Sequence, residues 1–302
     1  RDKLPMKKYI HQKYIYLIIL IAFACQKEGL PIDKRWQFVS GKRELSISGI
    51  SPTTNKDVFL VVHDNKKQGQ LRVGLIDFSA DSLYEGLDWP TQNLPIDLEA
   101  LADIPGFEDQ YVAMGSWGFC YLIQLDLKSK TIDLINEFRI PDSGPPLNLE
   151  SVLIFQESNK WYIAWAHRGS DKEDSILFWG SISLFDDNIS IIVEDSVLIN
   201  VPWPVNSKRH MSDMDIDDNK ILWSSATSDP GDEGPYASAI YKIGSFQIEN
   251  DEMKFILATP YLKQFVFESN KVEAMTIIKN KMVFATDDEN LGAAINMSVD
   301  GY

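Results

Sequence analysis

Carboxylate side chains recur at the start of short apolar segments, and carboxylates are well suited to holding a metal ion or moving a proton. They stand at Glu99, Glu150, Asp213 and Glu273. A fainter first copy has Gly49 at the corresponding place, and the intervals between the five positions are 50, 51, 63 and 60 residues. Acids repeated at this interval indicate a repeat architecture that can bring distant carboxylates together.

The segments that must position these acids have the patterns of β-strands. Each acid is followed by a turn and a second apolar segment, as in 161–165 and 281–285, and further apolar segments bounded by turn residues follow. Such a series predicts an all-β chain folded as a β-propeller with five blades. Six blades are the alternative, because the two longest intervals leave room for spare strands.

The two ends of the propeller segment are expected to meet. The fifth repeat offers strands only over 272–278, 282–285 and 293–299, one strand short of a blade. Because an unpaired strand edge is a liability, we expect an N-terminal strand to complete this blade and close the ring. The segments 36–39 and 44–47 are both able to supply it.

In a propeller, the start of each innermost strand and the loop between the second and third strands lie on one face, beside the central channel. The recurring acids belong to the first group. The second group contains His167, Arg168 and Asp287. We therefore expect these side chains to meet at one mouth of the channel.

Carboxylates gathered at a channel mouth need compensation. At about 6 Å and an effective dielectric of about 20, each like-charge pair costs roughly 2 to 3 kcal/mol. Calcium prefers carboxylate, carbonyl and water ligands, so we predict a calcium site. Its predicted ligands are Glu99, Glu150, Asp213, Glu273 and Asp287. The alternative is that each acid accepts backbone N–H groups of the next blade's inner strand and holds the ring together.

His167 and Arg168 are the candidates for contact with a substrate. A guanidinium beside an imidazole can grip an anionic group or assist proton transfer. A structural ion pair between Arg168 and the acids is the alternative. The acidic loop 229–235 lies over the same predicted mouth, either as a lid or as a solvated loop.

Bulk properties restrict the partners. The 302 residues carry a formal net charge of −15 and are 44% hydrophobic, enough for a large core. A nucleic-acid partner is excluded, because phosphate contacts need a basic face. We expect a monomer.

The first 25 residues have the pattern of an export leader. Met6, Lys7 and Lys8 precede the apolar run 14–24, and small residues at positions 22 and 24 precede Cys25. This arrangement is similar to a bacterial lipoprotein signal, in which Cys25 would carry the lipid. We expect a leader over 1–25, a tether over 26–35 and the propeller over 36–302, anchored to a bacterial membrane on its extracytoplasmic side, in the cell envelope. An uncleaved anchor or a general secretory signal is the alternative. The second cysteine, Cys120, lies in an apolar strand and is expected to be a buried, unreactive thiol.

Several of these segments resemble the recurrent motifs of bacterial phytase-like, or esterase-like, propeller proteins and of SdiA-regulated propellers. The segments that carry the resemblance are 95–100, 148–151, 213–215 and 286–290. The resemblance implies an exported propeller with calcium in or near its channel and phosphoester hydrolysis.

Two functions follow as hypotheses. The first is a calcium-dependent phosphoester or ester hydrolase, with Glu99, Glu150, Asp213, Glu273 and Asp287 on the metal and His167 and Arg168 on a small anionic substrate. The second is a non-catalytic surface propeller that binds a glycan, peptide or protein partner and uses calcium as a structural ion.

Overall fold

The computed structural model describes residues 35–184, 188–279 and 281–300. The predicted leader, the predicted lipidation site Cys25 and the predicted tether as far as residue 34 lie outside this part. Among the described residues, no helix has the length and apolarity needed to cross a membrane. The helical elements are the short 3-10 turns η1 (Arg43–Leu45) and η2 (Glu289–Leu291).

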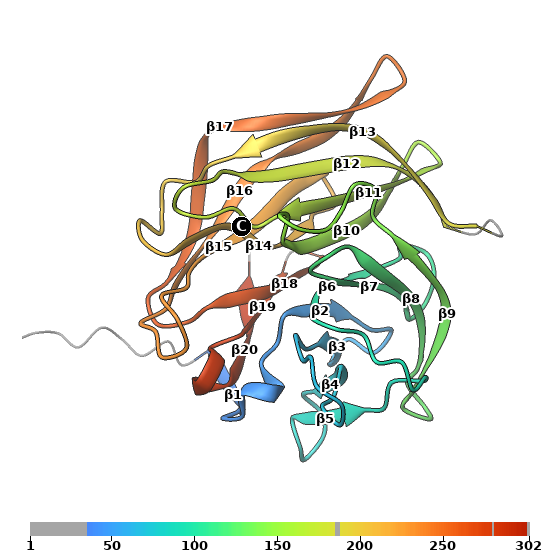
Figure 1. The fold of residues 1–302 in the computed structure, drawn as a ribbon, viewed down its shortest axis with the longest axis vertical. Helices are drawn as coiled ribbons and strands as arrows, with labels where there is room; N and C mark the ends of the chain where they lie inside the picture. The colour runs from blue at the N-terminus through green and yellow to red at the C-terminus, as the bar shows by residue number, and fades with distance from the viewer. Residues whose placement is uncertain (1–34, 185–187, 280, 301–302) are drawn as a thin grey trace, which may run out of the picture. The chain divides into compact units, whose positions relative to one another are not determined.

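The described chain forms five antiparallel sheets of four strands each, grouped around a common centre (Figure 1). Each sheet is one blade of a propeller. Blade 1 contains β2 (Gly49–Pro52), β3 (Val58–Val62), β4 (Val73–Asp77) and β5 (Tyr84–Leu87). Blade 2 contains β6 (Leu98–Asp103), β7 (Gln110–Gly115), β8 (Phe119–Asp126) and β9 (Thr131–Arg139). Blade 3 contains β10 (Leu149–Glu157), β11 (Lys160–His167), β12 (Ser175–Ser183) and β13 (Ser190–Ile199).

The last two blades complete the ring. Blade 4 contains β14 (Lys208–Ile216), β15 (Ile221–Ser228), β16 (Ala237–Glu249) and β17 (Glu252–Phe267). Blade 5 contains β18 (Val272–Ile278), β19 (Lys281–Thr286), β20 (Ala293–Asp300) and β1 (Trp36–Ser40). The innermost strands β2, β6, β10, β14 and β18 each contact the next, and β18 contacts β2. The prediction of a five-bladed propeller is therefore confirmed.

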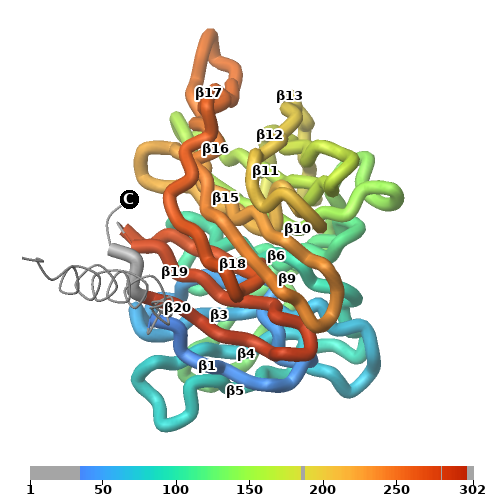
Figure 2. The backbone as a smooth tube through the Cα atoms, turned by 90° about the vertical axis from the view of Figure 1, so that its left-hand side faces the viewer, coloured from blue at the N-terminus to red at the C-terminus, as the bar shows by residue number. Residues whose placement is uncertain are grey.

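The ring closes through the N-terminal strand. β1 pairs antiparallel with β20, with Trp36 opposite Asn296 and Phe38 opposite Ala294 (Figure 2). This confirms the expected closure and selects 36–39 over 44–47, since residues 43–45 form η1 instead. The room left for a sixth blade is taken up by long strands, namely β13 with 10 residues, β16 with 13 and β17 with 16.

Apolar side chains pack between neighbouring sheets and hold the blades together. The inner strands are buried on both faces, which explains why β10 reads as a continuous buried run from Leu149 to Phe155. Between blades 3 and 4, Phe155 stacks on Tyr162 and lies 4.8 Å from Phe246, centroid to centroid. Truncating such a buried aromatic residue to alanine costs about 3–5 kcal/mol, so this packing fixes the frame on which the polar mouth is built. Cys120 is 1% exposed, as expected, and burial raises the pKa of its thiol.

Candidate functional site

Three of the recurring acids occupy the same structural position, a one-residue bulge near the start of an inner strand. In β6 the register passes from Leu98–Gly115 to Ala100–Met114, so Glu99 has no partner on β7. Glu150 in β10 and Glu273 in β18 are skipped in the same way. A bulge redirects the extra side chain. Each of the three bulges places one glutamate side chain at the channel mouth.

Blade 4 departs from this pattern. Asp213 is paired with Ser225 in the β14–β15 register, and its Oδ2 accepts a hydrogen bond from the backbone N–H of Met275 at 2.7 Å. Asp213 therefore ties β14 to the inner strand of the next blade, which is the alternative raised for the recurring acids. The side chain that blade 4 sends to the glutamates is Arg209, at the start of the irregular stretch of β14.

Arg209 joins carboxylates from three blades. Its Nη1 donates to Glu273 Oε1 at 2.6 Å and lies 3.3 Å from Glu150 Oε1, while Nη2 bonds Asp229 Oδ2. Glu150 and Glu273 are only 2% and 4% exposed. Burial opposes the charge on Arg209, but these carboxylates outweigh it and raise its pKa well above the usual range. The guanidinium is thus a fixed positive charge among the acids.

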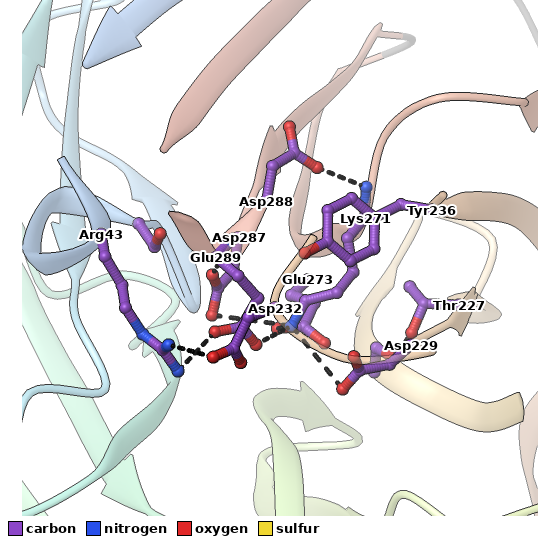
Figure 3. A network of polar contacts seen from close by, with 12 residues as sticks. Arg43, Thr227, Asp229, Asp232, Tyr236, Lys271, Glu273, Asp287, Asp288 and Glu289 are labelled. Atoms are coloured by element: carbon purple, nitrogen blue, oxygen red, sulfur yellow. Dashed lines mark hydrogen bonds and ion pairs between the residues drawn. The ribbon is translucent and has the colours of Figure 1, made fainter. Parts of the chain in front are cut away.

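Lys271 is a second fixed cation and is fully buried; Figure 3 shows it among acidic side chains that include Glu273 and Asp229. Its Nζ lies 2.6 Å from Glu289 Oε1 and 3.3 Å from Glu273 Oε2. Asp287 Oδ2 is 3.9 Å away, and Asp287 Oδ1 accepts the Glu289 N–H at 3.0 Å. Burial disfavours the charge on Lys271, but the surrounding carboxylates raise its pKa. The blade 5 side of the mouth is therefore neutralised by a lysine.

Glu99 differs from the other mouth acids. In the described part of the chain it has no hydrogen-bond or ion-pair partner, and its side chain is half-buried. Burial, followed by the nearby charges of Glu150 and Asp97, raises its pKa well above the ordinary value. Burial and the charge of Asp287 raise the pKa of Asp64 to about 6. The blade 1 and blade 2 side of the mouth therefore holds carboxyl groups whose pKa values are raised.

The five predicted calcium ligands do not form one ligand set as the structure places them. Calcium takes six to eight oxygen ligands, whereas Glu150 and Glu273 are bonded to protein cations and Asp213 to a backbone N–H. Asp287 accepts a backbone N–H and faces Lys271, so only Glu99 among the five keeps a carboxyl without a partner. No group of three or more His, Cys, Asp and Glu side chains within the described ranges is arranged to hold a metal. We derive no chemical step through a metal.

His167 and Arg168 occupy different environments. His167 is 4% exposed, and its Nδ1 accepts the backbone N–H of Asn148 at 2.9 Å, which places the imidazole in the wall of blade 3. Arg168 keeps 32% of its side chain exposed while its Nη1 donates to Glu150 Oε1 at 2.8 Å. Of the two, Arg168 is the one that can reach a ligand.

Arg168 lines a cavity of about 330 Å³ between blades 3 and 4. We call it the basic pocket, because four cationic side chains line it: Arg168, Lys172, Lys208 and Arg209. Its acidic lining residues are Asp171 and Asp229. Asp171 accepts the backbone N–H groups of Ser207 and Lys208 at 2.9 and 2.7 Å, and Asp229 is bonded to Arg209. Both acids are thus engaged within the protein. The cations outnumber them in the lining, although Arg168 and Arg209 also pair with carboxylates at the mouth.

The walls of the basic pocket are held by backbone contacts. The N–H of His210 donates to Arg168 O at 2.7 Å, and His210 Nε2 bonds Ser170 O at 3.1 Å. Gly169 has φ +70°, and a Cβ there would approach Ser175 N to 2.6 Å, so this loop requires glycine. The pocket is therefore formed before any ligand arrives. The sequence pattern indicated Arg168 but missed Lys172, Lys208 and Arg209, and the one available signal was the basic pair Lys208–Arg209 next to a strand start.

No family model and no curated protein matches the sequence. Among solved structures, an endo-arabinase from Bacteroides thetaiotaomicron VPI-5482 is similar at 9% identity, with a TM-score of 0.49 over 88% of this chain and 99% of that one. The RRP9 WD40 repeats are similar at 7% identity, with a TM-score of 0.44 over 89% of this chain and 99% of that one. Such likeness concerns the fold alone. The more specific resemblance to phytase-like and SdiA-regulated propellers stays a prediction, and what is established is a five-bladed β-propeller with a basic pocket beside an acidic channel mouth.

Proposed function

We propose that this protein binds a small anionic ligand in the basic pocket. The observation that carries the proposal is the gathering of Arg168, Lys172, Lys208 and Arg209 around one cavity in a chain whose net charge is −15. Lys208 Nζ donates to Val201 O at 2.8 Å, which leaves Arg168 and Lys172 as the cations most open to a ligand. Charge-assisted hydrogen bonds from such groups are worth about 1.5–3 kcal/mol each.

The ligand class follows from the donors. A guanidinium presents paired N–H groups that match the oxygens of a carboxylate, sulfate or phosphate, and an ammonium adds a mobile charge. The cavity volume of about 330 Å³ lies at the small end of ligand sites. We expect a small molecule with a terminal anionic group, or such a group at the end of a larger surface ligand.

A thermal-shift screen of sulfate, phosphate and acetate at constant ionic strength tests this proposal. Wild type should gain stability with at least one anion, and Lys172→Gln should gain less. Lys56→Gln is the matched control, since Lys56 is an exposed lysine in the loop between β2 and β3 that takes no part in the pocket. Equal shifts in the two variants would contradict the assignment of the pocket.

A second candidate function is hydrolysis of an ester or phosphoester bond in the bound ligand. It is favoured by Glu99, whose pKa is raised by burial and by the nearby charge of Glu150, an acid paired with Arg168 and Arg209. A protonated carboxyl can give its proton to a leaving oxygen. Turnover of model esters and phosphomonoesters with and without calcium tests this version, and turnover that survives Glu99→Gln unchanged would exclude Glu99 as the proton donor.

We also propose that the propeller works at an extracytoplasmic membrane surface, anchored through Cys25. The support is the leader sequence, in which a basic start, an apolar run and small residues precede the cysteine. Replacing Cys25 with serine in the expressed full-length chain should release the protein from the membrane fraction and abolish labelling by a radioactive fatty acid. Unchanged labelling would refute the anchor.

A further inference from the structure

We propose that Asp229 determines the specificity of the basic pocket, because its carboxylate occupies Arg209 as an internal competitor that an incoming anion must displace. This inference rests on the proposed anion-binding function. It predicts that the protein discriminates by charge, accepting dianions and rejecting monocarboxylates.

The geometry places Asp229 where a ligand's anionic group would lie. Its Oδ2 bonds Arg209 Nη2, and the same residue lines the pocket. Its Oδ1 accepts the N–H of Gly231 at 3.2 Å, and its side chain remains 15% exposed. Burial opposes ionisation of Asp229, but Arg209 and Lys271 outweigh it and lower its pKa, so the competitor is charged at neutral pH.

Asp229 can leave Arg209 without stranding that guanidinium. Arg209 Nη1 retains Glu273 at 2.6 Å and Glu150 at 3.3 Å, so its charge stays compensated from two other blades. Asp171, the other acid of the pocket, differs because it holds two backbone N–H groups that fix residues 207 and 208. Of the two acids in this pocket, Asp229 is the exchangeable one.

The loop that carries Asp229 is fastened from both sides. On the inner side, Asp229 N–H donates to Ser207 O at 2.8 Å, Tyr236 O–H donates to Gly231 O at 3.0 Å, and Asp229 Oδ2 lies 3.8 Å from Lys271 Nζ.

On the outer side the contacts are exposed. Arg43 Nη1 lies 3.1 Å from Asp232 Oδ2, with 51% and 58% of the two side chains exposed. Asn290 Nδ2 donates to Glu233 Oε1 at 2.9 Å. Gly231 and Gly234 both have positive φ. Exposed polar pairs contribute little to stability. Lys271 keeps Glu273 and Glu289, so an anion that pairs better with Arg209 can turn the Asp229 side chain away at small cost while the backbone contacts of the loop stay.

The charge rule follows from exchange. When a monocarboxylate displaces Asp229, one carboxylate replaces another at Arg209, and that exchange gains little binding free energy. The monocarboxylate is then bound only as tightly as its contacts with Arg168 and Lys172 allow. A dianion brings a second charge to the same cations and gains more. Asp229→Asn removes the competitor while preserving the shape of the side chain, so monocarboxylates should benefit most.

Isothermal titration of sulfate and acetate at fixed ionic strength, into wild type, Asp229→Asn and Asp171→Asn, tests the inference. Wild type should bind sulfate at least about tenfold more tightly than acetate. Asp229→Asn should bind acetate about tenfold more tightly than wild type does, so its preference for sulfate over acetate becomes smaller. Asp171→Asn should bind acetate no more tightly than wild type does. Thermal unfolding of each variant verifies folding.

The outcomes are separable. If wild type binds sulfate and Asp229→Asn binds neither anion more tightly, the competitor role is refuted while the anion site stands. If Asp229→Asn binds sulfate or acetate and wild type binds neither anion, the competitor role of Asp229 is supported in its strongest form. If neither protein binds any anion, the proposed function itself fails, and this inference fails with it.

Discussion

Replacing Arg209 with methionine should destabilise the propeller more than any other change at the mouth. The variant keeps the volume of the side chain but removes the guanidinium that Glu150 and Glu273 share. These acids are 2% and 4% exposed, and each then keeps one cation, Arg168 for Glu150 and Lys271 for Glu273. Removing one partner of a buried ion pair costs about 3–5 kcal/mol when the remaining charge is left without a partner, so this range is the upper bound on the loss of stability here. In a domain of this size that loss lowers the melting temperature by roughly 6–20 °C.

Thermal unfolding followed by circular dichroism measures the effect, with Arg168→Met as the control. Arg168 is more exposed, and Glu150 retains Arg209 when Arg168 is lost, so the control should lose only about 1 kcal/mol. Burial raises the pKa of Glu273 to about 8, so the loss in Arg209→Met should shrink as the pH falls below that value and Glu273 binds a proton. Equal and small losses in the two variants would refute the idea that Arg209 neutralises the mouth.

The same variant tests the predicted calcium site. Wild type already has arginine and lysine among the mouth carboxylates, so millimolar calcium should leave its melting temperature unchanged. Arg209→Met exposes two acids to a replacement cation, and calcium at 100 times its dissociation constant would return about 2.7 kcal/mol. A large calcium shift in wild type that Arg209→Met abolishes would contradict this account and favour a metal bound by the native mouth.

Three further predictions concern pH, Glu99 and ring closure. Burial raises the folded-state pKa of Asp64 to about 6, of Asp215 to about 7 and of Asp288 to about 6, above the ordinary value of 3.8. The native state then binds more protons than the unfolded state, so urea unfolding should show stability falling by several kcal/mol between pH 4 and pH 7, and a rise would contradict it. Glu99→Gln mimics the protonated carboxyl and should raise the melting temperature at pH 8 relative to wild type; a decrease would show that Glu99 is ionised and needed as such. Deleting residues 36–40 exposes the edge of β20, so size-exclusion chromatography should detect association or aggregation, and a stable monomer would show that β1 is dispensable.

The strands and the closure of the ring were predictable from the sequence because they depend on local patterns. Apolar residues at alternate positions, bounded by turn residues, mark the strands β6 to β9 of blade 2. The strand missing from blade 5 implied that another segment, such as β1, must complete that blade. The lengths of β13, β16 and β17 are harder to predict, because a long strand with exposed apolar residues looks in the sequence like two separate short segments.

The mouth was only partly predictable. The same sequence pattern surrounds Glu99, Glu150 and Glu273, so their convergence at one mouth could be inferred. In the structure each of the three lies at the same kind of bulge. Asp213 fits the same pattern in sequence, but an irregular stretch of β14 turns it toward Met275 and brings Arg209 forward. The compensation by Lys271 and the basic pocket both depend on contacts across blades, which no segment of sequence encodes by itself.

The most direct measurement of the central claim is a crystal structure with selenate, an anomalously scattering analogue of sulfate. The account predicts a selenate between Arg168 and Lys172 in the basic pocket, with the carboxylate of Asp229 moved away from Arg209. Selenate bound only at other surfaces, with the pocket unaltered at concentrations that saturate binding in solution, would contradict it.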